Sequence, residues 1–163
     1  MIDFRPPVLG DRTWAAPLAA AEGDPLCDYS FPVLLCWQET YGVSLARLGS
    51  RMLVQMKADW GLSYLWPVGK GDPIPALDAL AEDARRQGEP LRLICLGQAQ
   101  KDWLTRRYPG RFTFSEIRAG FDYLYDVDRL ADLPGRKLHA KRNHIHRLDE
   151  SRPGWTWAAL TEN

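Results

Sequence analysis

Residues 134–148 read Pro-Gly-Arg-Lys-Leu-His-Ala-Lys-Arg-Asn-His-Ile-His-Arg-Leu. The stretch holds five Lys or Arg residues, all three histidines of the chain and no acidic residue. Pro134 and Gly135 mark a break, and no further Pro or Gly follows until Pro153, which is typical of a helix of about three to four turns. The sequence therefore predicts a strongly basic helix near the end of the chain.

The predicted helix places cations beside its apolar residues. On a helical wheel Leu138, Ile145 and Leu148 share one stripe, with Lys141 inside it and Arg142 at its margin. This is unusual, because removing a charge from water is costly without a partner. Either the basic side chains reach the rim of the core with their stems on apolar surface, or Lys141 and Arg142 face a cleft in which an anion neutralises them.

Length and composition indicate one globular unit of ordinary size. The chain has 163 residues, a hydrophobic fraction of 45% and a mean hydropathy of −0.35. This length allows one core of normal size and is too short for two normal domains. Lys+Arg and Asp+Glu both number 21, so net charge makes no case for a nucleic-acid or membrane partner. Only the local charge of residues 134–148 does so.

The cysteines and histidines predict no metal site, and we expect no cofactor. Cys27, Cys36 and Cys95 form no CxxC pair, so we expect reduced core residues. His139 and His146 lie two turns apart on the predicted helix, too far to share an ion. With no signal peptide and no apolar segment of about 20 residues, we expect a cytoplasmic protein without a transmembrane segment that can still touch a membrane surface.

Local patterns predict alternating strands and helices. We expect strands or extended segments at residues 2–9, 43–48, 52–57, 62–68, 91–96, 111–117, 121–126 and 155–160, and helices at 11–22, 28–42, 75–87, 98–108, 127–133 and 136–148. Such an order is typical of an α/β or α+β fold with a central mixed sheet flanked by helices. Gly69-Lys70-Gly71, before one helix, is a weak phosphate-loop candidate, and plain turn chemistry is the favoured interpretation.

Several motifs resemble a bacterial family. Asp122-Tyr-Leu-Tyr-Asp126 followed by residues 130–147 resembles the signature of the C-terminal catalytic domain of phosphatidylglycerol lysyltransferase and of its uncharacterised relatives. Asp28-Tyr-Ser-Phe31, Trp37 and Tyr64-Leu-Trp-Pro-Val-Gly69 also fit this pattern. The resemblance covers most of the chain.

The resemblance implies a fold and an activity. Family members carry two N-acetyltransferase-like (GNAT) folds in tandem and move an aminoacyl group from a charged tRNA to an acceptor such as an anionic lipid head group. It implies that residues 1–150 form the first GNAT-like domain and that residues 151–163 begin the connection to a second domain, absent from this sequence. A second GNAT-like half or another copy of the chain is then an expected partner.

Seven residues are candidates for substrate binding, and no catalytic residue is assigned. Lys141 and Arg142 suit a phosphate or an oxyanion, whereas Asn143 either bonds a substrate or pairs locally. Arg118 and Asp122 form a structural pair or line a cleft. Tyr123 and Tyr125 flank a ligand or belong to the core.

Three hypotheses for function remain. The first is an aminoacyltransferase-type domain that is active only with a second half. The second is a non-catalytic module that binds tRNA or anionic head groups through the basic helix. The third is an N-acetyltransferase with an unusual acyl site, although the usual Gly-rich acyl-CoA loop is missing before residue 75.

Overall fold

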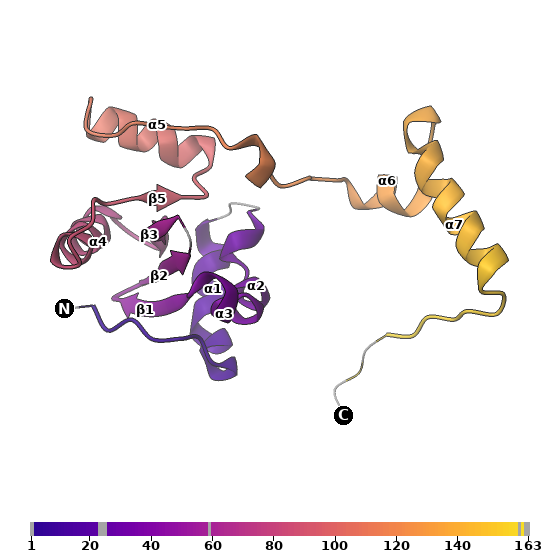
Figure 1. The fold of residues 1–163 in the computed structure, drawn as a ribbon, viewed down its shortest axis with the longest axis horizontal. Coiled ribbons are helices and arrows are strands. Elements are labelled where there is room, and N and C mark those ends of the chain that lie inside the picture. Colours follow the sequence, from indigo (N-terminus) through magenta and orange to yellow (C-terminus); the bar gives the residue numbers. More distant parts are fainter. Residues whose placement is uncertain (1, 23–25, 59, 160, 162–163) are drawn as a thin grey trace. The chain divides into compact units, whose positions relative to one another are not determined.

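The computed structural model describes residues 2–22, 26–58, 60–159 and 161. The chain divides into two compact units, Met1–Asp122 and Tyr123–Asn163, which are described separately below. Figure 1 shows the elements of each unit along the chain.

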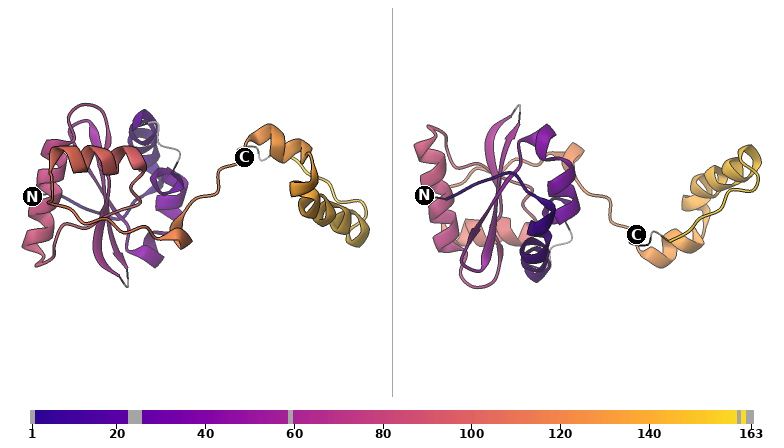
Figure 2. Two further views of the ribbon diagram at one scale, coloured as in Figure 1. Left: turned by 90° about the horizontal axis from the view of Figure 1, so that it is seen from above. Right: turned by 90° about the horizontal axis from the view of Figure 1, so that it is seen from below.

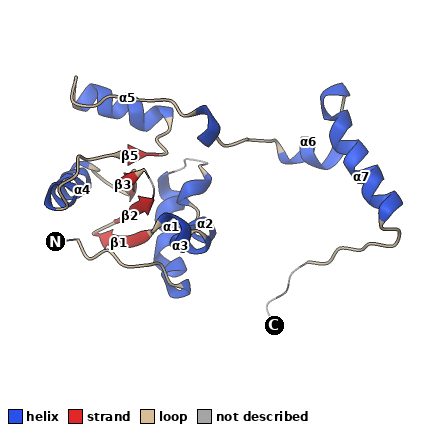
Figure 3. Cartoon of the chain, viewed as in Figure 1, coloured by secondary structure: helices blue, strands red, loops and turns tan. Residues whose placement is uncertain are grey.

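The first unit is built on one mixed sheet. Its strands β1 (Ser44–Leu48), β2 (Arg51–Ala58), β3 (Gly61–Leu65) and β5 (Leu93–Ile94) follow the order β1-β2-β3-β5. The first three form an antiparallel meander, as predicted, and β5 pairs in parallel with β3. The short strand β4 (Val68–Gly69) extends the sheet beside the start of β2. Figure 3 shows this sheet in red.

Helices lie on both faces of this sheet. The helical elements of the first unit are η1 (Leu9–Asp11), α1 (Arg12–Glu22), η2 (Cys27–Tyr29), α2 (Phe31–Cys36), α3 (Gln38–Tyr41), α4 (Ile74–Arg86), α5 (Gln98–Arg107) and η3 (Arg118–Gly120). In Figure 2 the sheet separates α4 from α1, α2 and α3. This arrangement confirms the predicted α+β class and is consistent with a GNAT-like fold.

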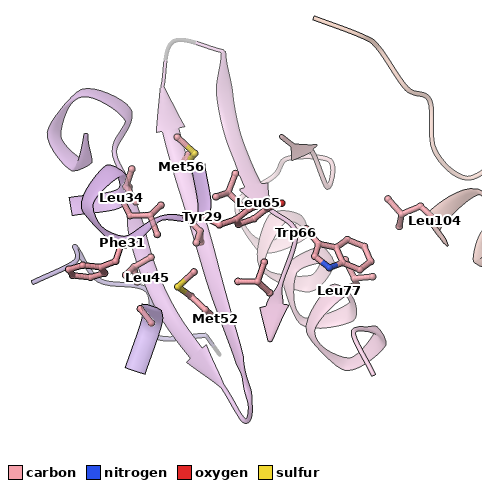
Figure 4. Packing of buried hydrophobic residues seen from close by; sticks show 14 residues of the cluster. Tyr29, Phe31, Leu34, Leu45, Met52, Met56, Leu65, Trp66, Leu77 and Leu104 are labelled. Carbon is pink, nitrogen blue, oxygen red and sulfur yellow. The ribbon is translucent and has the colours of Figure 1, made fainter. Parts of the chain in front are cut away.

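The two covered faces explain the residues of β2. Met52, Val54 and Met56 pack in the cluster that includes α1 and α2, whereas Leu53 packs with α4. Figure 4 shows Met52 and Met56 on the first of these faces. In sequence Leu53 breaks the alternation of apolar and polar residues. The structure gives the reason, because a strand covered on both faces needs apolar residues in both registers.

The predicted helix at residues 28–42 forms as two shorter helices. The backbone of Trp37 has φ −99° and ψ 8°, which leaves the α-helical region between α2 and α3. The predicted stop at Gly42 is confirmed. Gly42 has φ +55°, and a Cβ there would lie 2.7 Å from the carbonyl oxygen of Lys57.

Three predicted strands do not form. Residues 111–117 and 121–126 are irregular segments, and so are the described residues 155–159 and 161; residue 160 lies outside the described part. Alternating aromatic residues in 121–126 favoured a strand, but a strand also needs a neighbour to accept its hydrogen bonds. No such neighbour is paired with these segments in the described ranges.

The second unit is helical and has little core. It contains α6 (Val127–Asp132), η4 (Arg136–Leu138) and α7 (His139–Ser151), which confirms both predicted helices. Among its described residues Leu133 is the one buried apolar side chain, 7% exposed. Its large exposed apolar residues are Tyr123, Leu124, Tyr125, Val127, Leu130, Ile145, Leu148, Trp155 and Trp157.

The cysteines differ from the prediction in their burial. All three are free thiols, but Cys27 and Cys36 are exposed and Cys95 is half-buried. The prediction of core residues is therefore wrong for Cys27 and Cys36, whereas Cys95 packs against the hydrophobic core. Cys36 is the last residue of the six-residue helix α2, and Cys27 lies in the 3-10 turn η2 before it.

Candidate functional site

The turn before α7 sets the position of the basic helix. Asp126 caps α6, because its carboxylate accepts a hydrogen bond of 3.0 Å from the backbone N–H of Arg129. Leu133 then adopts a left-handed conformation with φ +46° and ends the helix. The chain passes through Pro134 and Gly135 into η4 and α7.

Arg142 is tied to this turn. Its Nη1 donates to the carbonyl oxygen of Leu133 and, at 3.0 Å, to that of Gly135. Both carbonyls follow α6, so the guanidinium closes the turn between α6 and α7. Arg142 therefore has an observed structural role. Its Nε and Nη2 groups take no part in these two bonds.

The other basic side chains of the helix are exposed. Arg136, Lys137, Lys141 and Arg147 lie on the surface of the second unit, as does Asn143. Acidic residues occur only on either side of the basic stretch: Asp132 precedes it and Asp149 follows it. The helix thus presents a local excess of positive charge, which is the property needed to attract a phosphate.

The two tyrosines of the motif are also exposed. The exposed fractions of Tyr123 and Tyr125 are 76% and 55%. Within this structure neither ring belongs to a core, which removes one of the two interpretations for these side chains. Exposed aromatic rings next to a basic helix suit stacking on a base or contact with a lipid surface.

Arg118 and Asp122 lie in the first unit. The Arg118 guanidinium lies over the ring of Phe121 at 5.0 Å from its centroid. Asp122 accepts hydrogen bonds from the backbone N–H of Cys27 at 2.9 Å and from the Cys27 thiol at 3.2 Å. Asp122 thus joins two segments 95 positions apart, in agreement with a structural role.

Asp122 is part of a cluster of thiols and carboxylates. Cys27, Asp28 and Asp122 place one ligand atom each within 4.8 Å of one another. The Cys95 thiol hydrogen-bonds the carboxylate of Asp28. Partial burial and the hydrogen bond to Asp122 raise the pKa of Cys27 to about 11, whereas burial and then the charge of Asp28 raise the pKa of Cys95 to about 12.

This cluster was not predicted from the sequence. Cys27, Asp28, Cys95 and Asp122 come from distant parts of the chain, and no local spacing connects them. One signal was present, because Asp28 and Asp122 both lie in the motifs that carry the family resemblance. Pairing those two motifs in space would have pointed to this region.

A cavity of about 260 Å³ lies beside the cluster. Asp28 and Cys95 line it together with apolar residues of α2, α3 and β2. Trp37 and Trp60 also line it, and the ring of Tyr41 packs on both, with centroids 5.5 and 5.6 Å apart. The cavity is thus mostly apolar, with a carboxylate and a thiol in its wall.

The Gly-rich loop before α4 is held by a buried arginine. Arg51 is 6% exposed and donates to the carbonyl oxygens of Pro67, Gly71 and Asp72. These carbonyl oxygens therefore face a cation of the protein itself, the Arg51 guanidinium. A phosphate loop instead presents its N–H groups to an external anion. The geometry therefore agrees with plain turn chemistry, the favoured interpretation of Gly69-Lys70-Gly71.

These features define an α+β domain with a basic helical extension. Residues 23–161 match the family model described as phosphatidylglycerol lysyltransferase, C-terminal. The chain therefore belongs to this family, which relates it to the aminoacyl-phospholipid synthases. No curated protein matches the chain.

A solved structure is similar over almost the whole chain. It is that of a conserved protein of unknown function from Bacteroides thetaiotaomicron VPI-5482, with 32% sequence identity and a TM-score of 0.87. The match covers 99% of this chain and 54% of that protein, so the chain spans about half the length of this relative.

None of the helices in the described part of the chain has the length and apolar character needed to cross a bilayer.

Proposed function

We propose that this chain is an aminoacyltransferase-type half-domain that binds the phosphates of a charged tRNA or of an anionic lipid head group on η4 and α7. Transfer of the aminoacyl group to its acceptor then requires a second GNAT-like half, in the same polypeptide, in another chain or in a second copy. Membership of the lysyltransferase family supports the reaction class.

The observation that carries the proposal is the exposed, unbalanced charge of the basic helix. Lys137, Lys141 and Arg147 are exposed, and no acid lies among them in the sequence. Each phosphate that these cations neutralise releases counterions, which gives tight binding at low salt and a steep loss of affinity as salt rises.

Arg142 contributes a fixed guanidinium to this surface. Two backbone carbonyls hold its Nη1, so the group loses less freedom than an unrestrained side chain when it meets an anion. Lys141 precedes it on α7 and supplies a second charge. We propose Asn143 as a hydrogen-bonding neighbour, and Tyr123 and Tyr125 as rings that stack on the ligand.

We propose that Arg118 and Asp122 position the segment next to the binding surface and do not themselves contact the substrate. Asp122 holds the segment before Tyr123 to Cys27, and Arg118 packs on Phe121. Both keep the end of the first unit in a defined conformation.

The need for a second half rests on the exposed apolar residues of the second unit. Ile145 and Leu148, on the apolar stripe of α7, are 47% and 42% exposed. Exposed apolar residues that share one stripe of a helix are typical of a surface that another domain covers. The solved relative, nearly twice the length of this chain, has room for such a domain.

The test is binding of aminoacylated tRNA by the full chain over a range of salt concentrations. Three substitutions together, Lys137→Ala, Lys141→Ala and Arg147→Ala, are expected to lower the slope of log K against log salt by about 2–3. The matched control changes three exposed cations of the first unit, Arg12→Ala, Lys70→Ala and Arg106→Ala, with the same loss of charge. Equal effects of the two triple variants would contradict the proposal.

The same samples distinguish the other hypotheses. Release of the amino acid from tRNA to phosphatidylglycerol vesicles only after addition of a second-half polypeptide supports the half-domain proposal. Binding that never leads to transfer, with or without that polypeptide, favours a non-catalytic module. Saturable heat of binding with acetyl-CoA, but none with tRNA, favours an acetyltransferase.

A further inference from the structure

Two thiols and two carboxylates meet in the first unit, away from the basic helix. Cys27 and Asp28 belong to η2, Cys95 directly follows β5, and Asp122 follows η3. Three separate parts of the chain thus supply the donors. The function proposed above uses only one bond of this cluster, from the backbone N–H of Cys27 to Asp122, and leaves its thiols and Asp28 without a role.

The distances within the cluster are close to those of a metal site. The ligand atoms of Cys27, Asp28 and Asp122 all lie within 4.8 Å of one another, and the Cys27 sulfur lies 3.2 Å from Oδ1 of Asp122. In tetrahedral zinc with bonds of about 2.0–2.3 Å, donor atoms are about 3.3–3.8 Å apart. Cys95 is not one of these three residues, but its thiol hydrogen-bonds the carboxylate of Asp28, which places a second sulfur at the edge of the group.

Hydrogen bonds hold the residues that carry the donors in place. The N–H of Cys27 bonds Oδ2 of Asp122 at 2.9 Å, which leaves Oδ1 directed at the thiol. The hydroxyl of Tyr29 donates to the carbonyl oxygen of Cys95 at 3.1 Å. Such bonds to the residues that carry the ligands fix their orientation before an ion arrives.

The charges also favour a cation. Asp28 is half-buried, and its carboxylate offers an oxygen within 4.8 Å of one from Asp122. Two carboxylates at this distance repel each other, and each disfavours a thiolate beside it. A dication reverses every one of these interactions, because it attracts both carboxylates and both thiolates.

The donor types select the ion. Two sulfur and two oxygen ligands suit a small, borderline-soft ion of coordination number four. Mg²⁺ and Ca²⁺ prefer six or more oxygen ligands and are poorly served by thiols. We propose that Cys27, Asp28 and Asp122 hold one Zn²⁺ ion and that Cys95, whose thiol is bonded to Asp28, is its fourth ligand, so that the ion joins η2, the end of β5 and the segment after η3. With four protein ligands the site is closed and structural.

The test uses Co²⁺ as a spectroscopic probe for Zn²⁺. The full chain is reduced, stripped of metal with EDTA and titrated with Co²⁺. We expect one equivalent to give the sulfur-to-cobalt charge-transfer band and the intense visible bands of a tetrahedral site, and Zn²⁺ to displace them. If the absorption spectrum of the native protein with Co²⁺ shows none of these bands, the proposal is overturned.

Variants assign the ligands. Cys27→Ser and Asp122→Asn are each expected to weaken binding by about 100-fold or more, because loss of outer contacts alone costs about 10–100-fold. Cys36→Ser is the matched control, since this exposed thiol lies outside the cluster, and it is expected to bind as the native protein does.

Circular dichroism separates loss of a ligand from loss of the fold. Cys27 is exposed, so Cys27→Ser is expected to keep the native spectrum without metal. Zn²⁺ is then expected to raise the Tm of the native protein and of Cys36→Ser, but not of Cys27→Ser. Native affinity in a folded Cys27→Ser variant, or equal loss in Cys36→Ser, would refute the assignment.

Discussion

The two compact units of the chain place their apolar side chains differently. In the first unit Leu53, Tyr64, Leu65 and Leu80 are fully buried between the sheet and its helices. In the second unit the apolar residues of α7 and of the segments around it are mostly exposed. The first unit is stabilised by its own hydrophobic core. The second unit depends on short-range contacts, such as the hydrogen bonds from Arg142 to the carbonyl oxygens of Leu133 and Gly135.

This difference indicates a division of roles. A sheet covered on both faces makes a rigid support, because its interior is close-packed. A helical unit with exposed cations and exposed apolar residues is suited to bind partners on more than one side. We therefore propose that the first unit is a scaffold and that the second unit carries the binding surface.

The largest expected difference between the units is in the effect of removing a leucine. Leu80→Ala leaves a cavity between α4 and the sheet and is expected to lower the free energy of unfolding by about 2–5 kcal/mol. Leu148→Ala, the same change at a side chain 42% exposed, is expected to cost less than about 1 kcal/mol. Urea denaturation of the two variants makes the comparison. Equal losses would contradict it.

The next comparison is between two arginines that each hold carbonyl groups. Arg51 is buried against the loop before α4, so Arg51→Ala leaves buried acceptors without a donor and is expected to cost about 2–4 kcal/mol. Arg142→Ala frees carbonyls that water can reach and is expected to cost about 1 kcal/mol. Denaturant midpoints of both variants test this order, and a reversed order would show that the second unit is the more tightly held.

A third prediction concerns pH and applies to the first unit. Asp11 is buried, and its carboxylate accepts bonds from Arg5, from the N–H of Val8 and from the indole of Trp14. These bonds, with Arg5 first, hold the pKa of Asp11 well below its usual value. The stabilisation is therefore complete above the unfolded pKa of about 3.9 and is lost as pH falls towards the folded pKa.

Asp11→Asn provides the measurement. The variant is expected to be less stable than the native protein by about 1–2 kcal/mol at pH 7. The gap between the two unfolding free energies is expected to narrow as the pH is lowered below 4. A gap that stays constant from pH 7 to pH 2 would refute a role for the Asp11 charge.

The smallest expected effect on stability is that of the basic helix itself. The triple change Lys137→Ala, Lys141→Ala and Arg147→Ala affects exposed side chains and is expected to alter the unfolding free energy by no more than about 0.5 kcal/mol. Its effect on anion binding is expected to be large. A loss of stability comparable to that of Leu80→Ala would identify these cations as part of the fold.

The sequence was sufficient where local pattern and tertiary environment agree. The meander of β1, β2 and β3, the stop at Gly42 and the helices α4, α5, α6 and α7 were all predicted from spacing and from turn residues. The strands expected at 111–117 and 121–126 were wrong, because alternation describes a strand's faces and not its neighbours. A pairing partner is a property of the whole fold.

The residues of the candidate site were likewise predicted where they are neighbours in the sequence and missed where the fold brings them together. The basic helix was visible in sequence, because its five cations are neighbours along the chain. The role of Arg142 was not, since its partners are backbone carbonyls that every residue type offers. The cluster of Cys27, Asp28, Cys95 and Asp122 is assembled by the fold alone, so spacing rules for metal ligands had nothing to detect.

The most direct test of the account is hydrogen exchange on the full chain, measured free and saturated with aminoacylated tRNA. If the second unit carries the binding surface, protection is expected to rise in residues 136–151, while the already protected amides of Met52–Met56 keep their rates. A ligand that protects the first unit and leaves α7 unchanged would contradict the account.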